Sequence, residues 1–159
     1  MAMSLLQREI KQGRPFASPA IEAYLNMART YGLLSCSMER FFKSYGISSA
    51  GYNVLRILRG SKLDGDDELP TLEVAQRLVS PVPDVTRLVD RLVRDGMVTR
   101  HRGHEDRRVV NVAITGKAQT LLKKIDKPLL EHHKSRLGQL SKADIKELTR
   151  LLEKVRQAL

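Results

Sequence analysis

Apolar residues recur at helical spacing in the first third of the chain. Between residues 18 and 45 they lie roughly along one stripe, which predicts a single long helix. The stripe consists of Ile21, Leu25, Ala28, Leu33, Met38, Phe41 and Phe42. Ser48 is typical of an N-cap and predicts a second helix that ends at Gly60. The polar segment SKLDGDDELP that follows predicts a solvated turn.

Two shorter amphipathic helices are predicted next. Thr71 is the expected cap of the first, TLEVAQRLV, whose inward positions are Leu72, Ala75 and Leu78. The prolines of SPVP end it, and the second helix is expected from about Pro83 to Arg94. Its inward positions are Val85, Leu88, Val89 and Leu92, and its outward positions are Asp84, Arg87, Asp90, Arg91 and Arg94.

Residues 98–115 have the pattern of a β-hairpin. A basic run leads to a Gly-centred, charged tip from about Gly103 to Arg107. After the tip, the apolar residues Val110, Val112 and Ile114 occupy every second position, as in a strand with one buried face. The alternating face is expected to pack on the helices, which leaves the tip free to reach a phosphate or the minor groove. Two helices separated by a short break and followed by such a hairpin form the order of a winged helix-turn-helix.

The last third of the chain predicts two more helices. The first spans 117–137, with a kink expected at Pro128. Ser141 and Asp144 form the pattern of a capping box, which opens the second helix. Its apolar seam consists of Ile145, Leu148, Leu151, Leu152, Val155 and Leu159. A seam of this length needs a partner, either within the monomer or, together with the long first helix, in a dimer.

Composition narrows the class of partner. The formal net charge of +10 over 159 residues favours a polyanion, although a ribosomal or membrane-surface protein would also be basic. All aromatic residues lie in the first third of the chain, whereas proteins that read single strands usually stack bases on aromatic side chains. Duplex DNA therefore fits better. A single cysteine, Cys36, and the lack of a membrane-spanning apolar run predict a soluble cytoplasmic protein.

The segment LVSPVPDVTRLVDRLVRDGMVTRHRGHEDRRVVNVAIT resembles the DNA-binding lobe of the MarR family of transcriptional regulators. The most specific portions are TRLVDRL followed by DG, and then EDRR before the alternating strand. The resemblance implies a mainly α fold with a small β-hairpin wing, that is, a winged helix-turn-helix with long N- and C-terminal dimerisation helices. It divides the chain into an N-terminal arm (1–17), a helical dimerisation region (18–46 and 117–159) and a DNA-binding lobe (47–116).

The resemblance further implies a homodimeric repressor that binds a pseudo-palindromic operator in duplex DNA and is released by a small-molecule effector. It is expected to be cytoplasmic, to need no cofactor and to have no enzymatic activity. The candidate DNA-binding residues are Thr71, Val82, Asp84, Thr86, Arg87, Arg91, Arg102, Asp106, Arg107 and Arg108. Among these, Arg108 matches the arginine of the family's Asp-x-Arg wing motif, and Asp106 is expected to pair with an arginine and orient it.

One part of the sequence departs from the family pattern. Small polar residues usually open the recognition helix, whereas here the matching positions are Pro81, Val82, Pro83 and Asp84. Direct base reading from this turn is therefore expected to be sparse, although Asp84 could accept a hydrogen bond from cytosine N4. The unusual turn also keeps open a second hypothesis, a winged-helix adaptor that binds proteins.

Other candidate sites each have a simpler structural explanation. The aromatic residues Phe41, Phe42, Tyr45 and Tyr52 could line an effector pocket or be plain core. Cys36 is expected to be a small packed residue, with oxidant sensing as the alternative. The acidic residues near Asp64 do not follow a calcium-loop spacing. The histidine pairs His101 with His104 and His132 with His133 lack zinc-site spacing, so no metal site is predicted.

Overall fold

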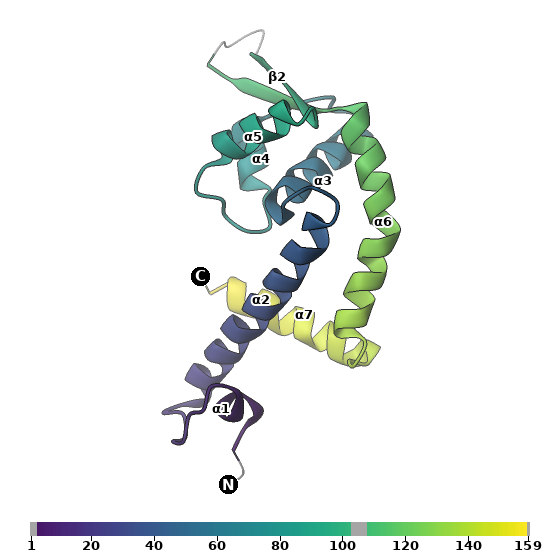
Figure 1. Cartoon of the computed structure of the whole chain (residues 1–159). Coiled ribbons are helices and arrows are strands. Elements are labelled where there is room, and N and C mark those ends of the chain that lie inside the picture. Colours follow the sequence, from purple (N-terminus) through teal and green to yellow (C-terminus); the bar gives the residue numbers. More distant parts are fainter. Residues whose placement is uncertain (1–2, 103–107, 159) are drawn as a thin grey trace. The chain divides into compact units, whose positions relative to one another are not determined.

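A computed structural model describes residues 3–102 and 108–158 of the chain (Figure 1). The chain divides into two compact units, Met1–Ser44 and Tyr45–Leu159. The described residues are mostly helical and include a small three-stranded antiparallel sheet, which confirms the predicted fold class. None of the helices in these residues is both long and apolar enough to span a bilayer.

The first unit contains a short helix in the N-terminal arm and one long helix. The short helix α1 (Leu5–Glu9) begins with a capping box between Ser4 and Gln7. An ion pair of 3.4 Å between Glu9 and Arg29 joins α1 to the long helix α2 (Pro19–Lys43). The long helix was predicted, but most of its apolar side chains are exposed in the single chain. The exposed set includes Ile21, Tyr24, Met27, Tyr31, Leu33 and Leu34.

The second unit has its core between α3 (Ser49–Asp64) and α6 (Gly116–Leu137). Ser48 caps α3 as predicted, because its side chain accepts a hydrogen bond from the Gly51 N–H at 3.0 Å. The predicted end at Gly60 was wrong. The helix passes through Gly60 and ends at Gly65, whose φ of 108° provides the left-handed conformation that terminates many helices. The most completely buried side chains between α3 and α6 include Leu55, Leu122 and Ile125.

The next helix, α4 (Thr71–Gln76), is shorter than predicted and differently oriented. Thr71 does not cap it: the N-cap is Pro70, and the Thr71 hydroxyl instead donates to the Val110 carbonyl at 2.9 Å. The predicted inward side chain Leu72 is 71% exposed, whereas Val74 is fully buried. The helix begins one residue earlier than a Thr71 cap requires, and its buried face is centred on Val74 rather than on Leu72.

The sheet contains a strand that the sequence did not indicate. It has the order β1–β3–β2, formed by β1 (Leu69–Pro70), β2 (Val98–Arg102) and β3 (Val110–Ile114). The hairpin of β2 and β3 was predicted, and its register pairs Val98 with Ile114. Residues 69–70 were assigned to a solvated turn. Instead, β1 pairs with β3, so that Leu69 lies opposite Val112 in the core.

The C-terminal helices begin where capping residues indicate. Thr115 accepts from the Ala118 N–H and opens α6, which continues through Pro128. The predicted capping box of Ser141 and Asp144 is confirmed and starts α7 (Lys142–Arg156). No residue of α7 is buried. Its apolar seam is therefore exposed in the single chain, at Ile145, Leu148, Leu151, Leu152 and Val155.

Candidate nucleic-acid interface

The helix α5 (Val85–Arg94) has one apolar and one basic face. Val89 and Leu92 are buried, which turns Arg87 and Arg91 to solvent on the opposite side. Neither arginine side chain forms an ion pair or a hydrogen bond with another residue in the described part of the chain. Both guanidinium groups are therefore available to bind an external anion.

Asp84 is the N-cap of α5. Its Oδ1 accepts a hydrogen bond from the Arg87 N–H at 2.8 Å, and this bond satisfies one of the free amides at the helix start. The predicted start at Pro83 was therefore wrong, since Pro83 precedes the cap. Thr86 follows in the first turn and is exposed.

A hydrogen bond to a side chain of α3 anchors the connection between α4 and α5. The Asn53 Oδ1 accepts a hydrogen bond from the Val79 N–H at 2.8 Å. The Val79 side chain is 87% exposed, and Val82 is half-buried. The turn before the basic helix is thus anchored through its backbone while apolar groups lie at its surface.

The wing places Arg102 at the end of β2 and Arg108 shortly before β3. Both side chains are exposed. Asp106 and Arg107, which the sequence analysis assigned to the wing tip, lie outside the described residues, as does His104 of the histidine pair. The contribution of these tip residues stays a prediction.

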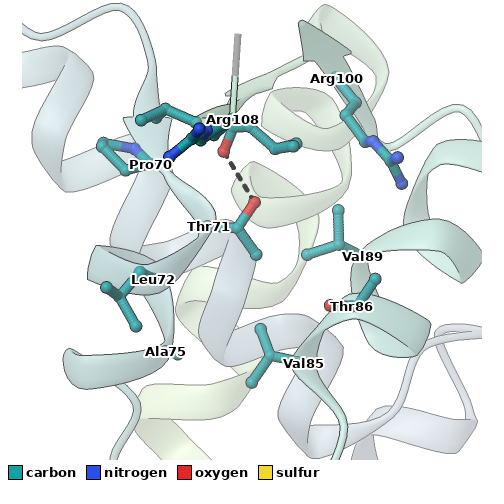
Figure 2. Close-up of a pocket in the computed structure, with 11 residues that line it drawn as sticks. Pro70, Thr71, Leu72, Ala75, Val85, Thr86, Val89, Arg100 and Arg108 are labelled. Atoms are coloured by element: carbon teal, nitrogen blue, oxygen red, sulfur yellow. Dashed lines mark hydrogen bonds between the residues drawn. The ribbon is translucent and has the colours of Figure 1, made fainter. Parts of the chain in front are cut away.

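An ion pair that the sequence analysis missed joins α5 to the wing. Asp90 on α5 pairs with Arg100 on β2. The helical pattern gave only the outward direction of Asp90, because the pairing depends on how the hairpin crosses α5. A second link is the bond from Thr71 to Val110, which connects α4 to β3 (Figure 2).

A pocket of about 530 Å³ lies between α4, α5 and the wing. Figure 2 shows Thr71 and Leu72 on one side, Val85 and Val89 on another, and the side chains of Arg100 and Arg108 above them. The walls are mainly apolar, and two guanidinium groups lie at one edge. This pocket was not predictable from the sequence, because its walls come from segments that are separated along the chain.

The aromatic residues proposed for an effector pocket belong to different units. Phe41 and Phe42 lie in the first unit, with their rings edge to face and 5.3 Å apart. Tyr45 and Tyr52 lie in the second unit. Burial raises the pKa of the Tyr52 hydroxyl, which is consistent with a position partly within the core. A shared pocket of these four residues stays a prediction.

A charged contact connects α3 to α6. Arg59 donates from Nη1 and Nη2 to the two carboxylate oxygens of Asp126, at 2.8 and 2.7 Å. The Arg56 guanidinium lies 3.8 Å from the same carboxylate. The hydrogen bonds from Arg59 lower the pKa of Asp126. We call Arg59 and Asp126 the α3–α6 ion pair.

The remaining candidates for chemistry do not form sites in the described residues. Cys36 is exposed, so the expectation that it is packed was wrong; the Arg40 Nε donates to its backbone carbonyl rather than to its thiol. His132 and His133 have ring centroids 6.5 Å apart. No cluster of three or more metal-ligating side chains occurs within residues 3–102 and 108–158.

Comparisons of the sequence and of the structure with known proteins agree with one another. The MarR family model matches residues 67–110. The crystal structure of a MarR transcription factor from Planctomyces limnophilus is 40% identical, with a TM-score of 0.67, and the match covers 87% of this chain and 98% of that one. The transcriptional repressor YetL of Bacillus subtilis is 30% identical over 102 residues, which are 63% of this chain and 59% of YetL.

A likeness in fold extends to a protein seen on DNA. A MarR mutant from E. coli, crystallised in complex with operator DNA, has a TM-score of 0.72 to this chain. The two are 21% identical, and the match covers 96% of this chain and 99% of that one. At this level of identity the comparison concerns the fold alone.

Proposed function

Because the chain belongs to the MarR family of transcriptional regulators, we propose that it is a homodimeric repressor of transcription. It binds a pseudo-palindromic operator in duplex DNA and is released by a small-molecule effector. It acts in the cytoplasm and has no enzymatic activity. The proteins that it resembles are transcription regulators, one of which is a named repressor.

The basic face of α5 carries this proposal. A capped helix with Arg87 and Arg91 directed away from the core can enter the major groove and reach both base edges and phosphates. The ion pair between Asp90 and Arg100 ties the helix to the wing. The wing arginines, Arg102, Arg107 and Arg108, then extend the contact toward the minor groove.

Dimerisation accounts for the apolar surfaces that the single chain leaves exposed. The dimerisation region is 18–46 with 117–159, and the DNA-binding lobe is 47–116. The seam of α7 and the apolar side chains of α2 are the surfaces that a second copy would cover. A two-fold dimer presents two recognition helices, so the half-sites of the operator lie about one helical turn apart.

The pocket beside α5 is our candidate for the effector site. Its mainly apolar walls suit a small organic compound. An occupant would lie between the recognition helix and the wing, the two elements that contact DNA. We expect it to stabilise the free protein and to weaken operator binding, which thermal unfolding and DNA titration with the same compound would measure.

Selection from random duplex DNA at near-physiological salt tests the proposed function. We expect an enriched inverted repeat whose affinity falls steeply with salt, because bound arginines release counterions from phosphates. Arg87→Ala and Arg91→Ala should each lose roughly 1–3 kcal/mol of binding free energy if they contact bases. Lys127→Ala is the matched control, since Lys127 is an exposed cation on α6. Failure to enrich any duplex would favour the protein-binding adaptor.

A further inference from the structure

The connection between α4 and α5 contains a short run rich in valine and proline. Residues 79–83 read VSPVP, and we call them the Val–Pro turn. We propose that the Val–Pro turn recognises the C5 methyl groups of thymines in the major groove, so that part of the operator specificity comes from apolar contact. This inference rests on the proposed function and assigns a base preference to one surface of the lobe.

The backbone of the Val–Pro turn is held in place before DNA binds. The bond from the Val79 N–H to Asn53 on α3 fixes its start, and the Asp84 cap fixes its end. Pro81 and Pro83 each hold their own φ near −65°, so little backbone entropy remains to be lost on binding. Both prolines and Val79 are exposed. The apolar groups are therefore ordered before any partner arrives.

Polar reading of bases by this turn is limited by its composition. The two prolines have no N–H to donate. Asp84 already accepts from the Arg87 N–H through Oδ1, so a cytosine amino group would compete for the acceptor capacity that is left, mainly on Oδ2. The C5 methyl of thymine is the apolar group that a DNA base presents in the major groove. It matches the chemistry that the turn offers.

The surrounding charge favours DNA over an apolar protein partner. Arg87, Arg91 and Arg94 follow the turn along α5, and all three are exposed. The carboxylate of Asp90 on the same helix is paired with Arg100, so it opposes the approach of phosphates less. An apolar turn directly before a basic helix suits the floor of a major groove with phosphates on both sides.

Replacement of thymine by deoxyuridine tests the inference, because it removes the methyl group and keeps every hydrogen bond. Each thymine of a selected operator is replaced in turn, at the equivalent place in both half-sites. Burial of one methyl group corresponds to about a fourfold change in affinity, so a symmetric pair should weaken binding about 15-fold. The dependence of affinity on salt should stay the same, since no phosphate contact is lost.

Variants of the turn identify the contacting surface. In Val79→Ala or Pro81→Ala, the loss of affinity on deoxyuridine substitution should shrink toward onefold, which is the coupling expected of two groups in contact. Leu63→Ala is the matched control, since Leu63 is an apolar residue on α3 with 83% of its surface exposed. It should keep the full deoxyuridine effect.

The outcomes separate this inference from the proposed function. If the unmodified operator is bound specifically but every deoxyuridine substitution changes affinity less than twofold, the turn does not read methyl groups and the inference is wrong. Persistence of the full effect in both turn variants would equally overturn it, because another surface would then hold the methyl. If no duplex is bound specifically, the proposed function itself fails.

Discussion

Replacing Asp126 by asparagine removes the charge of the α3–α6 ion pair while it keeps the size of the side chain. In the native chain, two hydrogen bonds of 2.7 and 2.8 Å join Asp126 to Arg59. The Arg59 side chain is 19% exposed and that of Asp126 is 43% exposed. The pair therefore lies between a surface contact and a buried one, and the substitution leaves a mostly covered guanidinium with a weaker acceptor.

The size of the effect follows from this position. An exposed ion pair contributes about 0.2–1 kcal/mol, whereas a hydrogen bond to a charged group contributes about 1.5–3 kcal/mol. Solvent screening at Asp126 favours the lower part of this span, so we expect Asp126→Asn to lower the free energy of unfolding by about 1–1.5 kcal/mol. For a domain of this size, that corresponds to a decrease in Tm of roughly 2–6 °C.

The pH dependence has a defined sign. Arg59 lowers the pKa of Asp126 in the folded protein, so the contribution is complete above the unfolded pKa of about 4 and is lost as the pH falls through the folded pKa. The difference in stability between the native protein and Asp126→Asn should therefore be full at pH 7. It should diminish below about pH 4, where the unfolded carboxyl takes up a proton, and it should be lost as the pH falls through the lower pKa of the folded state.

Thermal unfolding followed by circular dichroism at fixed protein concentration measures both effects. Asp67→Asn is the matched control, because the Asp67 side chain is 84% exposed and its carboxylate forms a surface ion pair of 3.0 Å with Lys62. It should change the free energy of unfolding by less than about 0.5 kcal/mol. The reasoning is refuted if the two variants are equally stable at pH 7, or if the deficit of Asp126→Asn is unchanged in acid.

Four further predictions concern DNA binding and assembly. Arg108→Ala should cost about 1–3 kcal/mol of operator binding free energy, and an unchanged affinity with an unchanged salt slope would contradict the wing assignment. A chain truncated before Ser141 should be monomeric or aggregate and bind DNA weakly; a well-behaved dimer in light scattering would place the interface elsewhere. Asp84→Ala should lower stability by about 1 kcal/mol through loss of the α5 cap, and Asp84→Asn should restore most of it in the same unfolding assay. Asp106→Ala should weaken binding to operator more than to scrambled duplex with little change in Tm, and tighter operator binding would reject its role in orienting an arginine.

The sequence predicted correctly those helices and strands that are determined by residues close together along the chain. The capping box at Ser141 and the alternation at Val110, Val112 and Ile114 are properties of short segments, and the structure confirms the helix and the strand. The same holds for the buried face of α5, where the spacing alone identified Val89.

Features that depend on distant segments were not predictable in the same way. Gly60 is a residue type that often ends helices. In this structure α3 continues past it to Gly65, because tertiary packing outweighs the low helix propensity of one glycine. Thr71 is a residue type that often caps helices, yet its hydroxyl donates a hydrogen bond to the Val110 carbonyl of β3. The pocket and the ion pair between Asp90 and Arg100 likewise need the hairpin to be folded back on the helices.

Because β1 pairs with β3, folding of the lobe also depends on the order in which the ribosome synthesises its segments. Leu69 and its partner Val112 are about 40 residues apart, so a ribosome that adds roughly 5–20 residues per second makes the partner some two to eight seconds later. Contacts among α3, α4 and α5 are closer in sequence and can form during that interval. The hairpin joins them next, and α6, which forms the core with α3, is synthesised after it. A translational pause before Val112 would leave the beginning of α4 without the strand that secures it, and would keep the nascent chain open to chaperones and proteases for longer.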